Sequence, residues 1–179
     1  MKESIKIRGI VEIKNGKTHI VAENHFTDEM MKMLVSFLAA KAEDQVDRPL
    51  PTSSWNMYIG TDTDTATTHS MTQLVSPIGT APGTEPNSKS GALTNPSPGV
   101  WRVVYSATWD AGTVSGTVGE VALYLTTTDH FSFEDSNWYC NAGANMVSRL
   151  SVADSAFSAF TIDESKPFTV TWTIEISSS

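Results

Sequence analysis

The chain has 179 residues and a formal net charge of −8 at pH 7, with 12 Lys and Arg against 20 Asp and Glu. This length fits a single domain with a substantial core, and the acidic balance argues against a nucleic acid or an anionic membrane as its partner. Charged residues make up only 18% of the chain, and Ser and Thr take their place on the predicted polar faces.

Two extended runs open the chain, at residues 4–14 and 17–23, and an Asn-Gly pair at 15–16 separates them. Asn-Gly accepts the positive φ angles of a type I′ turn, so the pattern predicts a β-hairpin. Ile10 falls out of phase with the other apolar residues of the first run and lies beside Gly9, which predicts a bulge or a bend there.

A helix is expected next. Thr27 is a favourable N-cap, and Asp28 and Glu29 place negative charge in the first turn, where the helix dipole favours it. The apolar stripe at helical spacing comprises Met30, Leu34, Phe37, Leu38 and Ala42. These residues predict a largely buried helix that ends near residues 42–43.

Apolar residues alternate from position 55 to 59 and predict a short strand, followed by a solvated Thr/Asp loop at 61–65. Asp62 and Asp64 have a spacing seen in calcium loops. The Gly and the distal Glu of an EF-hand loop are missing, so we favour the plain loop over a calcium site.

Residues 77–99 contain five Pro and four Gly among small polar residues, which predicts neither strand nor helix there. A loop of this length in a compact domain is uncommon and is usually functional or disordered. Two interpretations stay open: an arm that becomes ordered against a neighbouring subunit, and a floppy exposed excursion.

Strands are expected in the second half of the chain at 101–109, 118–125, 146–152 and 168–176. The last is the most regular, with apolar residues on one face and Thr on the other, and Pro167 opens it where a missing amide costs least. Within 118–125, the expected fate of Glu120 is solvent exposure; a subunit contact or a pair with an arginine are the alternatives. The segment 126–145 is expected to be irregular, and 156–162 is expected to be a turn-rich crossing with Phe157 and Phe160 as its apolar anchors.

Aromatic residues divide into two groups. Four tryptophans lie in phase with other apolar residues and are predicted to pack in the core: Trp55, Trp101, Trp109 and Trp172. Trp138 and Tyr139 lie in the irregular segment and are the candidate platform for stacking against a glycan.

Together these elements predict a mainly β fold, an antiparallel β-sandwich or jelly roll with one α-helix near the N-terminus. We expect a single domain over residues 1–179. Its parts are a hairpin plus helix (1–45), a sandwich core (53–76 and 100–179) and the Pro/Gly-rich loop (77–99).

No catalytic, cofactor or metal site is predicted, and a small-molecule ligand is not expected. The acidic pairs Glu134/Asp135 and Asp163/Glu164 lie beside predicted turns and are interpreted as turn formers, not as glycosidase carboxylates. Histidines fall in separate elements without metal-ligand spacing, at His19, His25, His69 and His130. The chain is therefore expected not to be an enzyme.

The first residues lack the apolar run of a secretory signal, and no stretch approaches the roughly 18 apolar residues of a membrane span. Cys140 is the single cysteine and is expected to be a reduced thiol. We therefore expect a protein made and folded in a cytoplasm.

Several segments carry a resemblance across most of the chain: Asn24–Thr27, Trp55–Thr61, Gly119–Tyr124, Met146–Leu150, Phe160–Asp163 and Lys166–Ile176. In order and spacing they resemble a broad group of small structural proteins of tailed bacteriophages and related viruses. Such proteins often carry Gly-Thr-Gly after the Trp strand and Gly before Leu-Tyr, where this chain has Asp62 and Ala122.

The resemblance implies a non-enzymatic virion component, such as a capsid decoration, a fibre base, or a tail or baseplate element. The expected partners are copies of itself, in a homo-oligomer that we expect to be a trimer, and other virion proteins, contacted through the N-terminal hairpin and residues 77–99. The expected location is the virion, after assembly in the host cytoplasm. The alternative is a carbohydrate-binding module that recognises host surface glycan through Trp138 and Tyr139; a sugar hydrolase ranks last.

Overall fold

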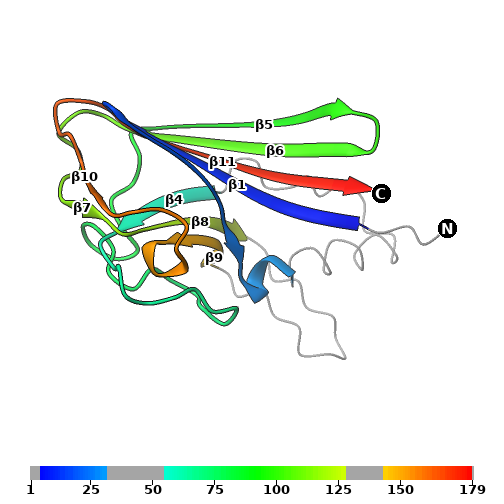
Figure 1. The fold of residues 1–179 in the computed structure, drawn as a ribbon, viewed down its shortest axis with the longest axis horizontal. Coiled ribbons are helices and arrows are strands. Elements are labelled where there is room, and N and C mark those ends of the chain that lie inside the picture. The colour runs from blue at the N-terminus through cyan, green and yellow to red at the C-terminus, as the bar shows by residue number, and fades with distance from the viewer. Residues whose placement is uncertain (1–4, 32–54, 128–142, 179) are drawn as a thin grey trace.

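The computed structural model describes residues 5–31, 55–127 and 143–178, which form two main antiparallel sheets (Figure 1). Sheet A has the strand order β2-β1-β11-β6-β5, with β1 (Ile5–Asn15), β2 (Thr18–Glu23), β5 (Ser88–Ser97), β6 (Val100–Trp109) and β11 (Phe168–Ser178). Sheet B has the order β3-β9-β8-β4, with β3 (His25–Phe26), β4 (Trp55–Gly60), β8 (Glu120–Thr127) and β9 (Gly143–Ser151). A small pair, β7 (Thr117–Val118) and β10 (Phe160–Thr161), and a 3-10 turn (Val152–Asp154) complete the described elements.

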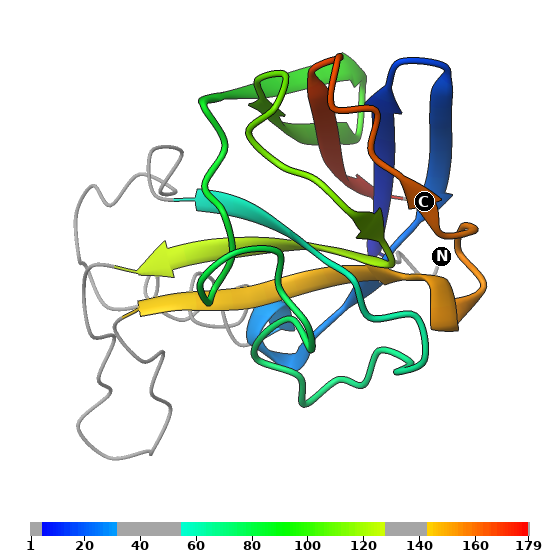
Figure 2. The same cartoon turned by 90° about the vertical axis from the view of Figure 1, so that its left-hand side faces the viewer.

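Sheets A and B lie as two layers around one apolar core. Figure 1 shows β4, β8 and β9 below the strands of sheet A, and Figure 2 shows that the strands of the two sheets run in different directions. The core draws on both layers, since β1, β6 and β11 contribute to the same buried cluster as β4, β8 and β9. A mainly β protein with antiparallel sheets is therefore confirmed.

The closing strand β11 behaves as its alternation predicts. Phe168, Val170 and Trp172 are at most 1% exposed, whereas the threonines between them are partly exposed on the other face. Because β11 pairs with β1 on one side and β6 on the other, it lies in the middle of sheet A.

The predicted N-terminal hairpin is present, but its turn is one residue later than expected. Asn15 pairs with Thr18, so the turn residues are Gly16 and Lys17, and Gly16 has a φ of +58°. The shift has a physical cause: the buried Asn15 side chain donates to carbonyl oxygens in the 163–167 segment and accepts from the Asp163 amide at 2.6 Å. The Asn15 backbone is therefore the last pair of the β1–β2 ladder, and its side chain holds the 163–167 segment against β1.

The predicted bulge at Gly9 and Ile10 is wrong. β1 pairs with β11 from Ile5 to Asn15 without a register shift. Gly9 instead makes room for a crossing side chain, because a Cβ at this position would overlap the Asn24 amide group. Glycine is required there because the Asn24 side chain approaches the backbone closely.

A helix begins at Asp28 and includes the described residues up to Met31, directly after Thr27 as predicted. The hydroxyl of Thr27 donates to the Met146 carbonyl at 2.6 Å, and this bond fixes the chain to β9. Met30 is buried in the main core, as its place on the predicted stripe requires. The rest of the predicted helix, residues 32–43, lies outside the described residues.

Two predictions for the second half of the chain are corrected. Residues 88–97, expected to lack regular structure, form β5, which pairs with β6 from Ser88 to Thr94. The prolines of this region lie before the strand or in its tip, where a register shift follows Thr94, so they do not interrupt the ladder. Trp101, expected in the core, is 52% exposed because it lies on the part of β6 nearest that tip.

Candidate functional site

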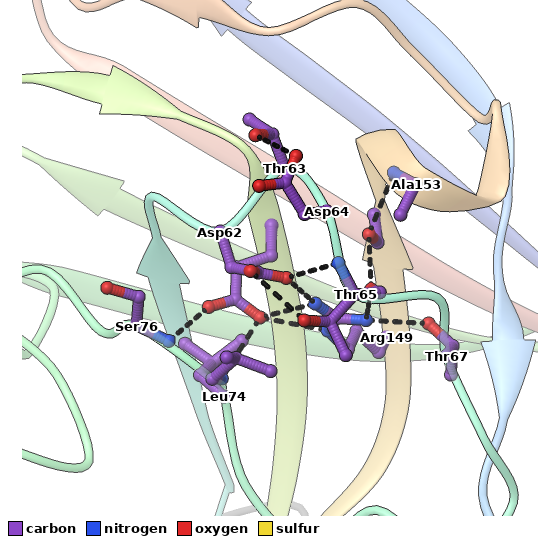
Figure 3. A network of polar contacts seen from close by, with 12 residues as sticks. Asp62, Thr63, Asp64, Thr65, Thr67, Leu74, Ser76, Arg149 and Ala153 are labelled. Atoms are coloured by element: carbon purple, nitrogen blue, oxygen red, sulfur yellow. Dashed lines mark hydrogen bonds and ion pairs between the residues drawn. The ribbon is translucent and has the colours of Figure 1, made fainter.

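Arg149 on β9 is the centre of a buried network of polar contacts (Figure 3). Its side chain has no exposed surface. Nε donates to Glu120 Oε2 at 2.9 Å, Nη2 forms an ion pair with the same oxygen at 2.8 Å, and Nη2 donates to Asp62 Oδ2 at 3.0 Å. Nη1 donates to the Thr65 carbonyl at 2.8 Å and to Thr67 Oγ1 at 3.1 Å. A guanidinium is suited to this role because it offers five donors in a fixed plane.

Glu120 on β8 is as deeply buried as Arg149 and carries the network into the backbone. Its two carboxylate oxygens accept from the amides of Ser76 at 2.8 Å and Val75 at 3.2 Å. Gly60 is required beside it, since a Cβ there would overlap the carboxylate and lie 2.6 Å from the Ser76 carbonyl. The expected solvent exposure of Glu120 is therefore wrong, and the alternative of a pair with an arginine is confirmed.

These contacts hold residues 61–76, here called the strap, across the outer face of sheet B. The Thr61 amide donates to the Ser76 carbonyl, which joins the two ends of the strap, and the Ile78 amide just beyond the strap donates to the Ile59 carbonyl. Within the strap, Thr67 donates to Asp154 through both its amide and its hydroxyl. Figure 2 shows this segment below β4, β8 and β9. Sheet B is thus covered on both faces, by sheet A and by the strap.

A second apolar cluster lies under the strap, formed by Tyr58, Leu74, Ala122, Tyr124 and Met146. The Tyr124 hydroxyl accepts from the Leu74 amide at 2.8 Å. Burial is the main reason why the pKa of Tyr124 rises to about 12. The tyrosine rings of this cluster meet edge-on, with centroids 5.2 Å apart.

The chemistry of the Arg149 network is structural. Each carboxylate oxygen of Glu120 and Asp62 accepts at least one hydrogen bond, from Arg149, from backbone amides or from the Thr65 hydroxyl. Removing one partner of such a buried set leaves an uncompensated charge, which typically costs about 3–5 kcal/mol. Asp62, considered above for calcium, is bound by an arginine, and Asp64 accepts from the adjacent Thr63 hydroxyl.

The predicted glycan platform, Trp138 and Tyr139, lies outside the described residues, as do Cys140, His130 and the pair Glu134/Asp135.

Asp163 occupies a turn and accepts from the amide and hydroxyl of Ser165, at 3.1 and 2.6 Å. These bonds lower the pKa of Asp163. The described part of the chain contains no group of three or more His, Cys, Asp or Glu residues that could hold a metal ion.

Core placement is confirmed for three of the four in-phase tryptophans: Trp55, Trp109 and Trp172 are at most 3% exposed. Trp55 packs against Tyr105 with ring centroids 5.0 Å apart. Lys89 of β5 extends over Trp55, donating to its carbonyl at 3.0 Å and to Asn56 Oδ1 at 2.5 Å. This contact fixes the base of the β5–β6 hairpin to sheet B.

The β5–β6 hairpin is the main exposed feature of the described chain. All ten residues of β5 are exposed, and β5 forms one edge of sheet A. Leu93 and Trp101 are 59% and 52% exposed. Figure 1 shows the hairpin extending beyond the strands of sheet B, together with the ends of β1 and β11.

The exposed Leu93 and Trp101 lie on the same face of sheet A as buried and half-buried apolar residues of the neighbouring strands. The register places Ile7, Ile176 and Trp101 side by side on β1, β11 and β6, and places Ile174, Val103 and Leu93 in the next row. The same alternation continues into the core at Tyr105 and Trp172, so this face begins as core and ends as surface. Sequence periodicity cannot reveal that change, because it fixes the face but not the length of the opposing layer.

No family, curated protein or solved structure matches this chain. Among the described residues, no helix is long and apolar enough to cross a membrane.

Proposed function

We propose that this chain is a non-enzymatic structural protein that works by assembly with other protein chains, and that its two layers form a β-sandwich built for that purpose. The observation that carries the proposal is β5, an edge strand that is exposed along its whole length beside the apolar residues Leu93 and Trp101. An exposed sheet edge offers unpaired amides and carbonyls to an incoming strand.

The rigid body behind the hairpin supports the same proposal. The Arg149 network fixes the strap to sheet B, and Lys89 fixes the base of the hairpin to β4. Interaction surfaces gain affinity when they are held in their bound shape before contact. A fully covered sheet B and an uncovered hairpin therefore suit a scaffold that presents one arm.

The site of assembly that we propose is the virion of a tailed phage or related virus, as a capsid decoration, a fibre base, or a tail or baseplate component. This part rests on the sequence resemblance described above. The proposed partners are further copies of the chain and other virion proteins, and the proposed location is the particle after assembly in the host cytoplasm.

The test is a pair of matched variants. Leu93→Lys combined with Trp101→Lys places two charges on the exposed apolar face of the hairpin, while Val75→Lys, at a residue that is 47% exposed on the strap, is the control. Tagged chains are then expressed in the host during phage production, and the purified particles are assayed for the tag. We expect the double variant to be excluded and the control to be incorporated as well as the unaltered chain.

Three results contradict the proposal. The first is normal incorporation of the double variant, and the second is absence of the unaltered chain from particles. The third is binding of the unaltered chain to a broad glycan array that is lost on Trp138→Ala, which would favour a carbohydrate-binding module.

A further inference from the structure

The outer edge of β5 lacks the usual protection of an exposed strand. Among the described residues, no strand pairs with its outer side, and none of the residues from Ser90 to Asn95 is charged. Natural sheets protect their edges with charges, prolines or bulges. Here Lys89 precedes the uncharged stretch, and Pro96 follows it within the register shift, so both features flank the stretch and leave it open.

We propose that this edge pairs with β5 of a second copy of the same chain, antiparallel and about a twofold axis at Ala92. The two sheets A would then continue into one another across the axis. The inference rests on the assembly function proposed above and names the partner at the hairpin. A twofold contact joins the same patch on both copies, so the strand must be complementary to itself.

Steric fit supports this register. Residues directly opposite across a strand pair share a face, so the axis at Ala92 places Leu93 of one copy opposite Gly91 of the other. Gly91 leaves the space of a side chain open at the edge, because a Cβ there would make only ordinary contacts, 3.6 Å from Trp55 Nε1 and 3.8 Å from Tyr105 Cδ1, while both rings are themselves buried. Leu93, exposed in a single copy, would fill that place from the second copy.

Charge and backbone chemistry disfavour the neighbouring registers. An axis at Gly91 would place Lys89 opposite the apolar Leu93. An axis at Leu93 would bring Pro96, which has no amide to donate, further into the ladder, opposite Ser90, whereas the axis at Ala92 leaves it at the last pair, opposite Ser88. With the axis at Ala92, Lys89 faces Asn95, and the two lysines are roughly 20 Å apart at about 3.3 Å per residue.

The test uses charge at the axis. Ala92 is exposed, so Ala92→Glu and Ala92→Lys should keep the fold, which an unchanged urea midpoint would verify. In sedimentation velocity over a concentration series, we expect the unaltered chain to form dimers. Each single variant should weaken the dimer at least about tenfold, because like charges meet at the axis. An equimolar mixture of the two variants should restore it. Val21→Glu places the same charge at a residue that is 62% exposed on β2, the opposite edge, and should leave the dimer unchanged.

A crosslink tests the register itself. In a Cys140→Ser background, Ala92→Cys should form an intersubunit disulfide under mild oxidation, since the Cα atoms of directly opposed residues lie about 4.5–5.5 Å apart, within the roughly 4.4–6.8 Å that a disulfide spans. Leu93→Cys, which faces Gly91 of the second copy, should not form one.

The other outcomes separate this inference from the function on which it rests. Dimers that resist Ala92→Glu, or a trimer broken by both Ala92→Glu and Val21→Glu, would overturn the β5–β5 contact and leave assembly in place. A monomer whose incorporation into particles is lost on Ala92→Glu would also overturn it, because the strand on β5 would then belong to a different chain. A monomer that is incorporated equally well with Ala92→Glu would overturn the β5–β5 contact and argue that the hairpin is not the assembly surface.

Discussion

Replacing Arg149 by Met tests whether the buried network holds the strap in place. Met keeps much of the volume of the arginine stem but removes the hydrogen bonds that Arg149 donates to Glu120, Asp62 and Thr65. Two carboxylates then remain beside sheet B with only backbone amides and one threonine hydroxyl as partners. Breaking a buried ion pair in this way typically costs about 3–5 kcal/mol, so the free energy of unfolding should fall by that amount.

The measurement is urea denaturation, combined with hydrogen exchange of the Val75 and Ser76 amides, which bind Glu120. A double-mutant cycle with Glu120→Gln isolates the pair, and the two losses should fall short of additivity by roughly 2–3 kcal/mol. A loss below about 1 kcal/mol, or additive losses with both amides still protected, would show that the strap is held by other contacts and would refute the reasoning.

Two further predictions concern Gly9 and Tyr124. Gly9→Ala should lower the free energy of unfolding, measured in urea, by about 1–3 kcal/mol, because its Cβ would overlap the Asn24 amide group. Gly91→Ala meets only ordinary contacts and is the matched control. Equal losses in the two variants would contradict this account. The pKa of Tyr124 is about 12 in the fold against an ordinary value of 10.0, so the unfolded chain loses this proton first and stability should fall as pH rises from 10 towards 12. Tyr124→Phe should reduce that fall, and an unchanged slope of stability against pH would count against the buried phenol.

Local pattern predicted the strands well, because period-two alternation reports which residues share a face. β11, β6 and β4 were all recognisable from their apolar residues, and Asn-Gly at 15–16 indicated the hairpin. Its turn shifted by one residue because Asn15 has partners in the 163–167 segment, far away in sequence. A contact of that kind leaves no local signal.

The failures have the same physical origin. β5 is stabilised by the ladder with β6 and not by burial, so its sequence of small polar residues resembles a loop. Arg149 was missed because a single cation in an apolar strand has no meaning until the fold brings Glu120 and Asp62 to it. One cue was available: an arginine and a glutamate, each within an otherwise apolar run, are costly to bury unless they meet.

The order of the strands in sheet A has a consequence for biosynthesis. β11 is translated after the other four strands, yet it lies between β1 and β6 and pairs with both over nearly its whole length. Until β11 leaves the ribosome, the β1–β2 and β5–β6 hairpins have no common neighbour, and two long inner edges stay open to wrong partners. Completion of the sheet must therefore await the end of translation of this strand, and any ribosome that stops before residue 168 releases a chain without the middle of its larger layer.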